Sequence, residues 1–144
     1  MEDKFLVGLD EYKILDEENP IGYVRDIKTC MAILIHKEKN TALLHVESYD
    51  NTIFIDNFME LLRAEKGNKI KSVDIFMGDE TSIGNLSIIK FILHKLKIDY
   101  HVYQVFKDLS NSTSIGYNYL TNDYYMAEMD KGNPKFIKKL LQWK

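Results

Sequence analysis

The chain has 144 residues, of which 45% are apolar and 28% charged, and its net charge is −3. This length suits one domain with a proper core, and the composition excludes a disordered or low-complexity chain. The balanced charge lacks the positive field of a nucleic-acid binder, and no apolar run approaches the roughly 20 residues that span a bilayer. We therefore expect a single cytoplasmic domain over residues 1–144, with no nucleic acid and no membrane insertion.

The first third of the chain predicts β-structure. Apolar and β-branched residues alternate or run together between turn-forming residues, which is typical of short strands. The two longest apolar runs are separated by four polar residues, and this pattern predicts a β-hairpin. The expected strands cover residues 4–9, 12–15, 22–25, 30–36 and 41–46.

The middle of the chain predicts two helices, each followed by a strand. Asp50 or Asn51 caps the first helix, which ends near Gly67, and Thr81 or Ser82 caps the second. Both helices carry an apolar face that would pack on a sheet. The apolar faces comprise Phe54, Phe58, Leu61 and Leu62, then Leu86, Ile89, Leu93 and Leu96, and the strands cover residues 71–77 and 98–106.

The last part predicts a tyrosine-rich hairpin and a third helix. The hairpin joins residues 114–120 to residues 124–129, and Asn133-Pro134 is typical of a helix start. Four apolar residues follow at positions 136, 137, 140 and 141 and would form the buried face of this helix. The expected fold class is α+β, a mixed or largely antiparallel sheet with about three helices packed over it.

The first hairpin brings together two residues that could carry chemistry. Cys30 is the single cysteine of the chain, which excludes an internal disulfide and a four-cysteine zinc site. A turn centred between Lys37 and Glu38 pairs residues whose numbers sum to 75, so Cys30 faces His45. Directly opposed residues have Cβ atoms about 4.5–5.5 Å apart, which lets a thiol and an imidazole meet.

A thiol beside an imidazole is the minimal pair for covalent catalysis. The histidine takes the thiol proton, the thiolate attacks, and the histidine later protonates the leaving amine. With a carboxamide, attack gives an oxyanion, then a thioester and ammonia, and water finally releases the acid. The backbone N–H of Cys30 and the hydroxyl of Thr29 are the expected oxyanion donors. The alternative is that Cys30 is a small buried hydrophobe.

The segments around this pair resemble the CheD-like deamidases, which are chemoreceptor glutamine deamidases of bacterial chemotaxis. The resemblance rests on Val-Gly-Leu-Asp-Glu-Tyr at residues 7–12, Thr-Cys-Met-Ala-Ile at residues 29–33, and His45. The hairpin is also similar to that of protein N-terminal asparagine amidohydrolase, and cytotoxic-necrotizing-factor-type glutamine deamidases share the order of cysteine and histidine. Later segments that match in the same order are residues 75–78, 83–85, Asp108 and residues 114–118.

The resemblance implies a single CheD-like domain that hydrolyses a glutamine or asparagine carboxamide in a protein. Carried over residue by residue, it makes Cys30 the nucleophile and His45 the general base and acid. We place Ser48 and Gly78 at the substrate cleft, and we expect no metal or other cofactor. The expected partner is a protein substrate, either a chemotaxis-type protein or, for a bacterial effector, a host protein.

The sequence departs from the family where a threonine orients the histidine, because Val24 stands there. The imidazole needs only an acceptor for its second ring nitrogen, so a backbone carbonyl, Thr29, Ser48 or Glu47 could serve instead. Thr29 is our first choice.

Two alternative functions remain open. The missing threonine and the altered segment 26–29 suggest a catalytically inactive CheD-like binding module that sequesters a protein partner or ligand. A third possibility keeps the Cys–His pair but cleaves a thioester, an ester or a peptide bond.

Three further features are expected to be structural. His36 lies at the predicted hairpin turn and would be a solvated residue at the rim. The tyrosines of the last hairpin would pack across their strands. The acidic residues Asp74, Asp79 and Glu80 lack the spacing of a metal-binding loop.

Overall fold

The computed structural model describes residues 5–25, 27, 29–47, 53–78, 83–104, 114–130 and 133–140. This part of the chain contains nine strands and two helices, so the expected α+β class is confirmed. In chain order the elements are β1 (Tyr12–Leu15), β2 (Ile21–Val24), β3 (Met31–Lys37), β4 (Thr41–Val46), α1 (Ile53–Leu62), β5 (Ile70–Met77), α2 (Ile83–Lys95), β6 (Tyr100–Gln104), β7 (Ser114–Asn118), β8 (Asp123–Asp130) and β9 (Asn133–Leu140).

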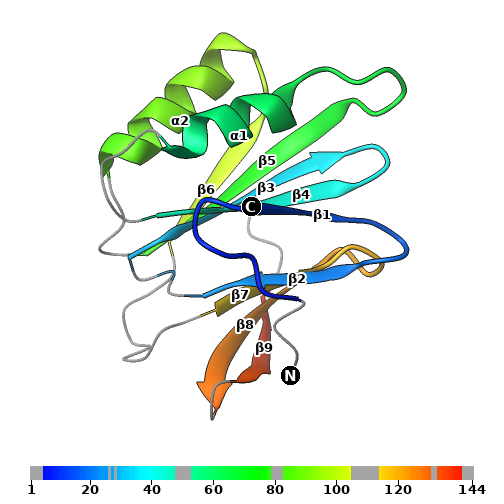
Figure 1. Cartoon of the computed structure of the whole chain (residues 1–144), viewed down its shortest axis with the longest axis vertical. Coiled ribbons are helices and arrows are strands. Elements are labelled where there is room, and N and C mark those ends of the chain that lie inside the picture. Colours follow the sequence, from blue (N-terminus) through cyan, green and yellow to red (C-terminus); the bar gives the residue numbers. More distant parts are fainter. Residues whose placement is uncertain are drawn as a thin grey trace.

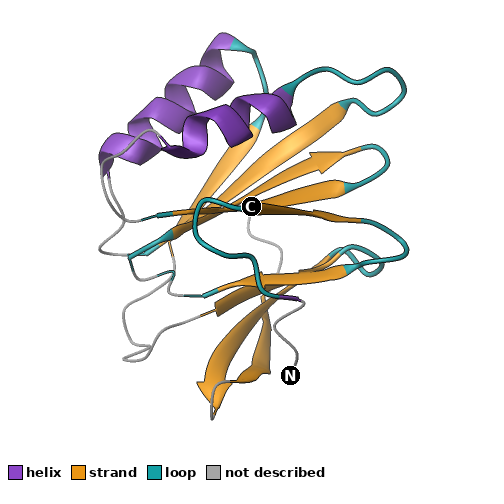
Figure 2. Ribbon diagram, viewed as in Figure 1, coloured by secondary structure: helices purple, strands orange, loops and turns teal. Residues whose placement is uncertain are grey.

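The strands form two sheets, and both helices lie on the outer face of the larger one (Figures 1 and 2). The larger sheet has the order β1-β4-β3-β5-β6, in which β5 and β6 are parallel and the other neighbours antiparallel. The smaller sheet is antiparallel, with the order β2-β7-β8-β9. The described residues therefore form three layers: helices, a mixed sheet and an antiparallel sheet.

Two apolar clusters hold these layers together. The first lies between the helices and the larger sheet and includes Ile33 of β3, Phe58 of α1 and Ile89 of α2. The second lies between the two sheets and includes Leu34 of β3 and Ile115 of β7. Because β3 is central and covered on both faces, it is buried along its whole length, which explains its uninterrupted apolar run.

The two helices follow their predicted apolar faces, with shorter ends. The four apolar residues expected inside α1 are buried, and the helix ends at Leu62, before Gly67. In α2, Ile89 and Leu93 are buried, but Leu96 is 47% exposed because the helix ends at Lys95. Neither of these two helices, the ones found in the described residues, is long and apolar enough to cross a membrane.

The prediction of a third helix is wrong, because Asn133–Leu140 forms β9. This strand pairs with β8, so tertiary pairing overrides the local helix signal. The pairing register shifts beside Ile137: Ala127 pairs with Phe136, but Met126 pairs with Lys138. The extra residue at this bulge disturbs the two-residue alternation by which a strand is recognised.

The predicted register of the first hairpin is also wrong, by two residues. The pairs sum to 77, so His45 faces Ala32 and Thr41 faces His36. The turn residues are Glu38 and Lys39, one step later than expected, and their backbone N–H groups donate to Lys69 O at 3.0 Å and Asn68 Oδ1 at 2.7 Å. These partners lie about 30 residues downstream, so the contacts that fix this turn are tertiary.

Candidate functional site

The corrected register keeps Cys30 and His45 on one face of the larger sheet. A shift of two residues preserves the alternation of side chains, because successive side chains point to opposite faces. His45 lies on the face toward the smaller sheet, and Cys30 falls on that face when the alternation of β3 is continued by one residue. The two residues become diagonal neighbours, for which the Cα separation is about 7–8 Å.

The second ring nitrogen of His45 is held by a backbone carbonyl. Nδ1 lies 2.9 Å from the carbonyl oxygen of Val7. A carbonyl oxygen can only accept, so Nδ1 carries the proton, and the lone pair of the neutral imidazole is on Nε2. A backbone carbonyl was one of the acceptors left open by the sequence, and the bond described for this nitrogen is to Val7 instead of Thr29, the first choice. Val24 is fully buried between the two sheets.

Cys30 is 5% exposed and lies just before β3. The hydroxyl of Thr29 is 3.8 Å from its sulfur, within the range of a weak O–H···S contact. When the pairings of β3 with β4 and with β5 are each continued by one residue, Glu47, after β4, and Gly78, after β5, lie beside Cys30. Thr29 and Gly78 therefore lie at the same end of the sheet as the Cys–His pair. Ser48, which was expected to bind the substrate, lies outside the described residues.

His36 belongs to a buried polar cluster, so the prediction of a solvated residue is wrong. Its Nδ1 is 3.1 Å from Thr41 Oγ1, and its Nε2 is 3.0 Å from Asp74 Oδ2 and 2.6 Å from the hydroxyl of Tyr124. Tyr124 in turn donates to Asp74. The packed tyrosine rings of β7 and β8, Tyr117 and Tyr124, have centroids 4.9 Å apart and cover the cluster, as cross-strand packing predicts.

The charges of this cluster are compensated internally. Burial of Asp74 would raise its pKa, but the hydrogen bonds from His36 and Tyr124, together with the charges of His36 and His101, outweigh burial and lower the pKa. Burial and the nearby carboxylate raise the pKa of Tyr124 far above its ordinary value, so its hydroxyl remains a donor. The cluster is therefore an ionised carboxylate satisfied by two donors.

Thr41, His36 and Asp74 follow the order of a hydroxyl–imidazole–carboxylate triad, but the rings of Tyr117 and Tyr124 pack against the imidazole. Thr41 is 1% exposed and His36 9% exposed, whereas Cys30 and His45 are each 5% exposed, so exposure does not distinguish the two groups. Within the described residues no group of three or more histidine, cysteine or acidic side chains could hold a metal ion, and Asp79 and Glu80 lie outside those residues. The strand alternation could have revealed this cluster, since His36 shares a face with Ala32 and Leu34.

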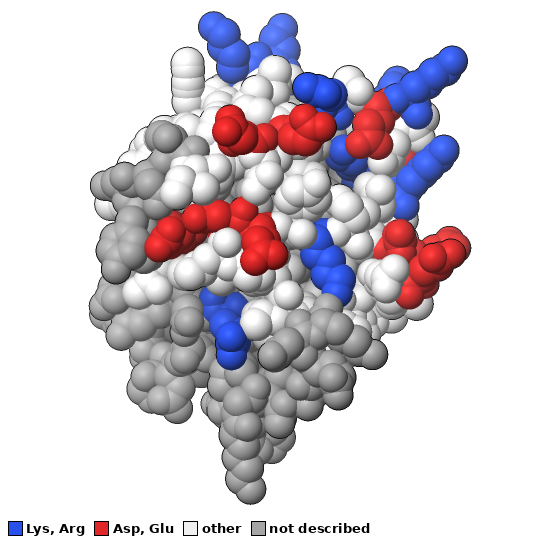
Figure 3. Space-filling view, viewed as in Figure 1, with Lys and Arg blue, Asp and Glu red and all other residues white. Residues whose placement is uncertain are grey.

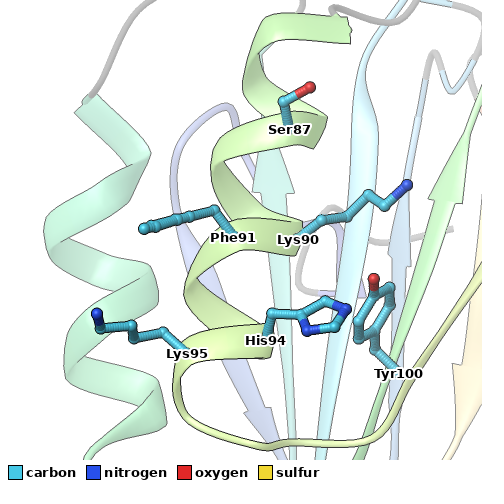
Figure 4. Close-up of a pocket in the computed structure, with 6 residues that line it drawn as sticks. All are labelled: Ser87, Lys90, Phe91, His94, Lys95 and Tyr100. Carbon is cyan, nitrogen blue, oxygen red and sulfur yellow. The ribbon is translucent and has the colours of Figure 1, made fainter.

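A concave surface also lies along the exposed side of α2 (Figure 4). Phe91, which is 57% exposed, and Lys95 extend to one side of the helix, whereas Lys90 and His94 extend to the other, where His94 faces Tyr100. These side chains spread apart instead of converging on one point. On the face drawn in Figure 3, acidic and basic side chains are interspersed, so charge does not single out a docking surface there.

At this end of the sheet the register thus places a thiol, an imidazole and a hydroxyl, those of Cys30, His45 and Thr29, near one another. Comparison with known proteins adds no family assignment: no family model matches the chain, and no curated protein matches it significantly.

Proposed function

We propose that this chain is a cysteine-dependent amidohydrolase that converts a glutamine or asparagine carboxamide of a protein to the acid. The observation that carries the proposal is the bond from His45 Nδ1 to the carbonyl oxygen of Val7. This bond selects the tautomer in which Nε2 is basic, on the face of the sheet where the register puts Cys30.

The residues supply each step of the reaction. Nε2 of His45 accepts the thiol proton, and the Cys30 thiolate attacks the carboxamide carbon. The C–N bond breaks as the imidazolium protonates the amine, which leaves ammonia and a thioester. Water, deprotonated by the same nitrogen, then cleaves the thioester to a carboxylate and restores the thiol. The hydroxyl of Thr29 lies close enough to the sulfur to donate to charge that develops there.

Ammonia release tests the proposal directly. The purified chain, incubated with protein extracts, is expected to release ammonia and to convert specific carboxamides to carboxylates, detected by mass spectrometry. Cys30→Ser and His45→Ala should each reduce both signals to background while the circular dichroism stays unchanged. His94→Ala is the matched control, because His94 is an exposed histidine on α2 and should retain full activity.

The alternative of a binding module predicts no ammonia release above background, in the wild type as in Cys30→Ala. If Cys30→Ala releases ammonia as fast as the wild type, or if His45→Ala keeps full activity, the proposed mechanism is wrong. Acylation of Cys30 by activated esters and by peptides, without ammonia release from any carboxamide, would instead identify an esterase or peptidase that uses the same pair.

A further inference from the structure

The segment Val7–Glu11 surrounds His45 with three hydrogen bonds. Besides the bond from Nδ1 to Val7 O, the backbone N–H of His45 donates to Glu11 O at 3.0 Å, and the backbone N–H of Asp10 donates to His45 O at 2.7 Å. Residues 4–9 were expected to form a strand, but the described residues 5–9 form a single isolated bridge, from Leu6 to Tyr23. The segment crosses from the smaller sheet to the larger one (Figure 1).

The two backbone bonds have the pattern of a β-bulge. Asp10 and Glu11 together oppose His45, the first donating to its carbonyl and the second accepting from its N–H. In a bulge of the G1 kind, the first of the two residues adopts a left-handed conformation and is usually glycine. Asp10 occupies that position with a φ of 57°. Bulges of this kind recur beside active sites, where they aim a side chain.

A turn sets the conformation of Asp10. Glu11 N–H donates to Gly8 O at 3.1 Å, which closes a four-residue turn whose third residue is Asp10. A positive φ at the third position is the mark of a type II turn, which favours glycine or asparagine there. In a type I turn the peptide before the third residue is rotated by about 150–170° relative to type II. The N–H that Asp10 donates to His45 would then point away.

Hydrogen bonds to its side chain and to its carbonyl oxygen hold Asp10 in place. Its Oδ1 accepts from Glu47 N–H at 3.3 Å, and its carbonyl oxygen accepts from Asn57 Nδ2 of α1 at 2.8 Å. Upstream, Val7 N–H donates to Tyr23 O of β2 at 3.0 Å. The carbonyl that holds the imidazole is therefore fixed to the smaller sheet, and the bulge is fixed to β4 and α1.

We infer that Asp10 is a positioning residue, which holds His45 in the Nδ1-protonated tautomer through the left-handed turn at residues 8–11. Its importance for catalysis rests on the proposed function, whereas its effect on the tautomer does not. A β-branched residue cannot readily hold a positive φ, but asparagine and glycine can. A series of substitutions at position 10 therefore distinguishes the effect of the backbone conformation from the effect of the carboxylate.

The test measures the ring ¹⁵N chemical shifts of His45 in Asp10→Asn, Asp10→Gly and Asp10→Val. The wild type, Asp10→Asn and Asp10→Gly should show one neutral tautomer with the proton on Nδ1, and Asp10→Val should show a mixture. Leu15→Ala is the matched control, because it removes a fully buried side chain of β1 and should lower stability without changing the tautomer. A single unchanged tautomer in Asp10→Val, or the same mixture in Leu15→Ala, would overturn the inference.

Kinetics add a second readout. Asp10→Val should lower kcat for carboxamide hydrolysis by about 100-fold, with KM little changed, because misplacement of a catalytic group by about 1 Å has effects of this size. Asp10→Asn should restore the rate. If no variant, wild type included, releases ammonia, the proposed function fails, but the ¹⁵N shifts still decide the role of Asp10.

Discussion

Two histidines of one hairpin lie on the same face of the larger sheet, one near each end, and they are held in different ways. Both ring nitrogens of His36 contact side chains, namely Thr41 on one side and Asp74 and Tyr124 on the other. His45 is held through Nδ1 by a backbone carbonyl, and its backbone is enclosed by a bulge. The ring of His36 is thus held by side chains of three strands, whereas the tautomer of His45 is set by the main chain.

The two sites also differ in how their partners lie along the sequence. The partners of His36 come from β4, β5 and β8, so that cluster joins the two sheets. Three hydrogen bonds of His45 are made with one short segment, residues 7–11. Mutations in the first cluster should therefore act on stability, and mutations around His45 should act on reactivity.

The most direct test compares the reactivity of Cys30 when each of the two histidines is removed. His45→Ala should slow alkylation of Cys30 at pH 7 about tenfold and move its apparent pKa toward the free-cysteine value of about 8.5, because the imidazolium no longer stabilises the thiolate. His36→Ala should leave the alkylation profile unchanged and lower the free energy of unfolding. Iodoacetamide kinetics against pH and urea denaturation measure the two effects. Equal alkylation profiles in the wild type and His45→Ala would remove the basis for a reactive pair.

The next effect concerns the stability of the cluster. Asp74→Ala leaves the donors of His36 and Tyr124 without their shared acceptor in a buried site, and this should cost about 2–4 kcal/mol of unfolding free energy. Asp56→Ala, at an exposed position of α1, is the control and should change stability by less than about 0.5 kcal/mol. A loss of similar size in both variants would mean that the cluster contributes nothing specific.

Local patterns were sufficient for most elements of the larger sheet and its helices. The apolar faces of α1 and α2 follow from helical periodicity, and β3 and β4 follow from continuous apolar runs, so those elements were predicted close to their observed bounds. The last strand could not be predicted in this way, because its bulge beside Ile137 breaks the alternation and its pairing with β8 is a tertiary contact. A helical spacing of four apolar residues was the stronger local signal there.

The candidate site shows a similar limit. The sequence predicted that Cys30 and His45 share a face of the sheet, because a register shift of two residues does not change the face. It did not predict that they are diagonal neighbours, because this depends on the position of the turn at Glu38 and Lys39. The acceptor for His45 is a main-chain carbonyl, and no residue type identifies such a group in advance. Asp10 gave a weak signal, since aspartate is among the few residues that tolerate a left-handed turn.

A smaller effect follows from the pKa of Asp74, which is lower in the folded chain than its ordinary value. A carboxyl group with a lowered folded pKa stabilises the fold at pH values above its unfolded pKa of about 3.9, and this contribution is lost as the pH falls through the folded pKa. The difference in unfolding free energy between the wild type and Asp74→Asn should therefore be constant near neutral pH and shrink below about pH 4. Denaturation at pH 3 and pH 7 measures it. A difference that grows at low pH would contradict the assignment of an ionised Asp74.

The smallest effect tests whether the hydroxyl of Tyr124 stabilises the fold through its hydrogen bond to Asp74. Tyr124→Phe keeps the ring and its packing against Tyr117 but removes one of the donors to Asp74, so the unfolding free energy should fall by about 1–2 kcal/mol. Tyr12→Phe, at a position that is 42% exposed, provides the matched control and should be neutral. The loss in Tyr124→Phe should disappear in an Asp74→Ala background, because the acceptor is then absent. An additive loss in the double variant would show that the hydroxyl acts independently of Asp74, and the cluster would no longer be one unit.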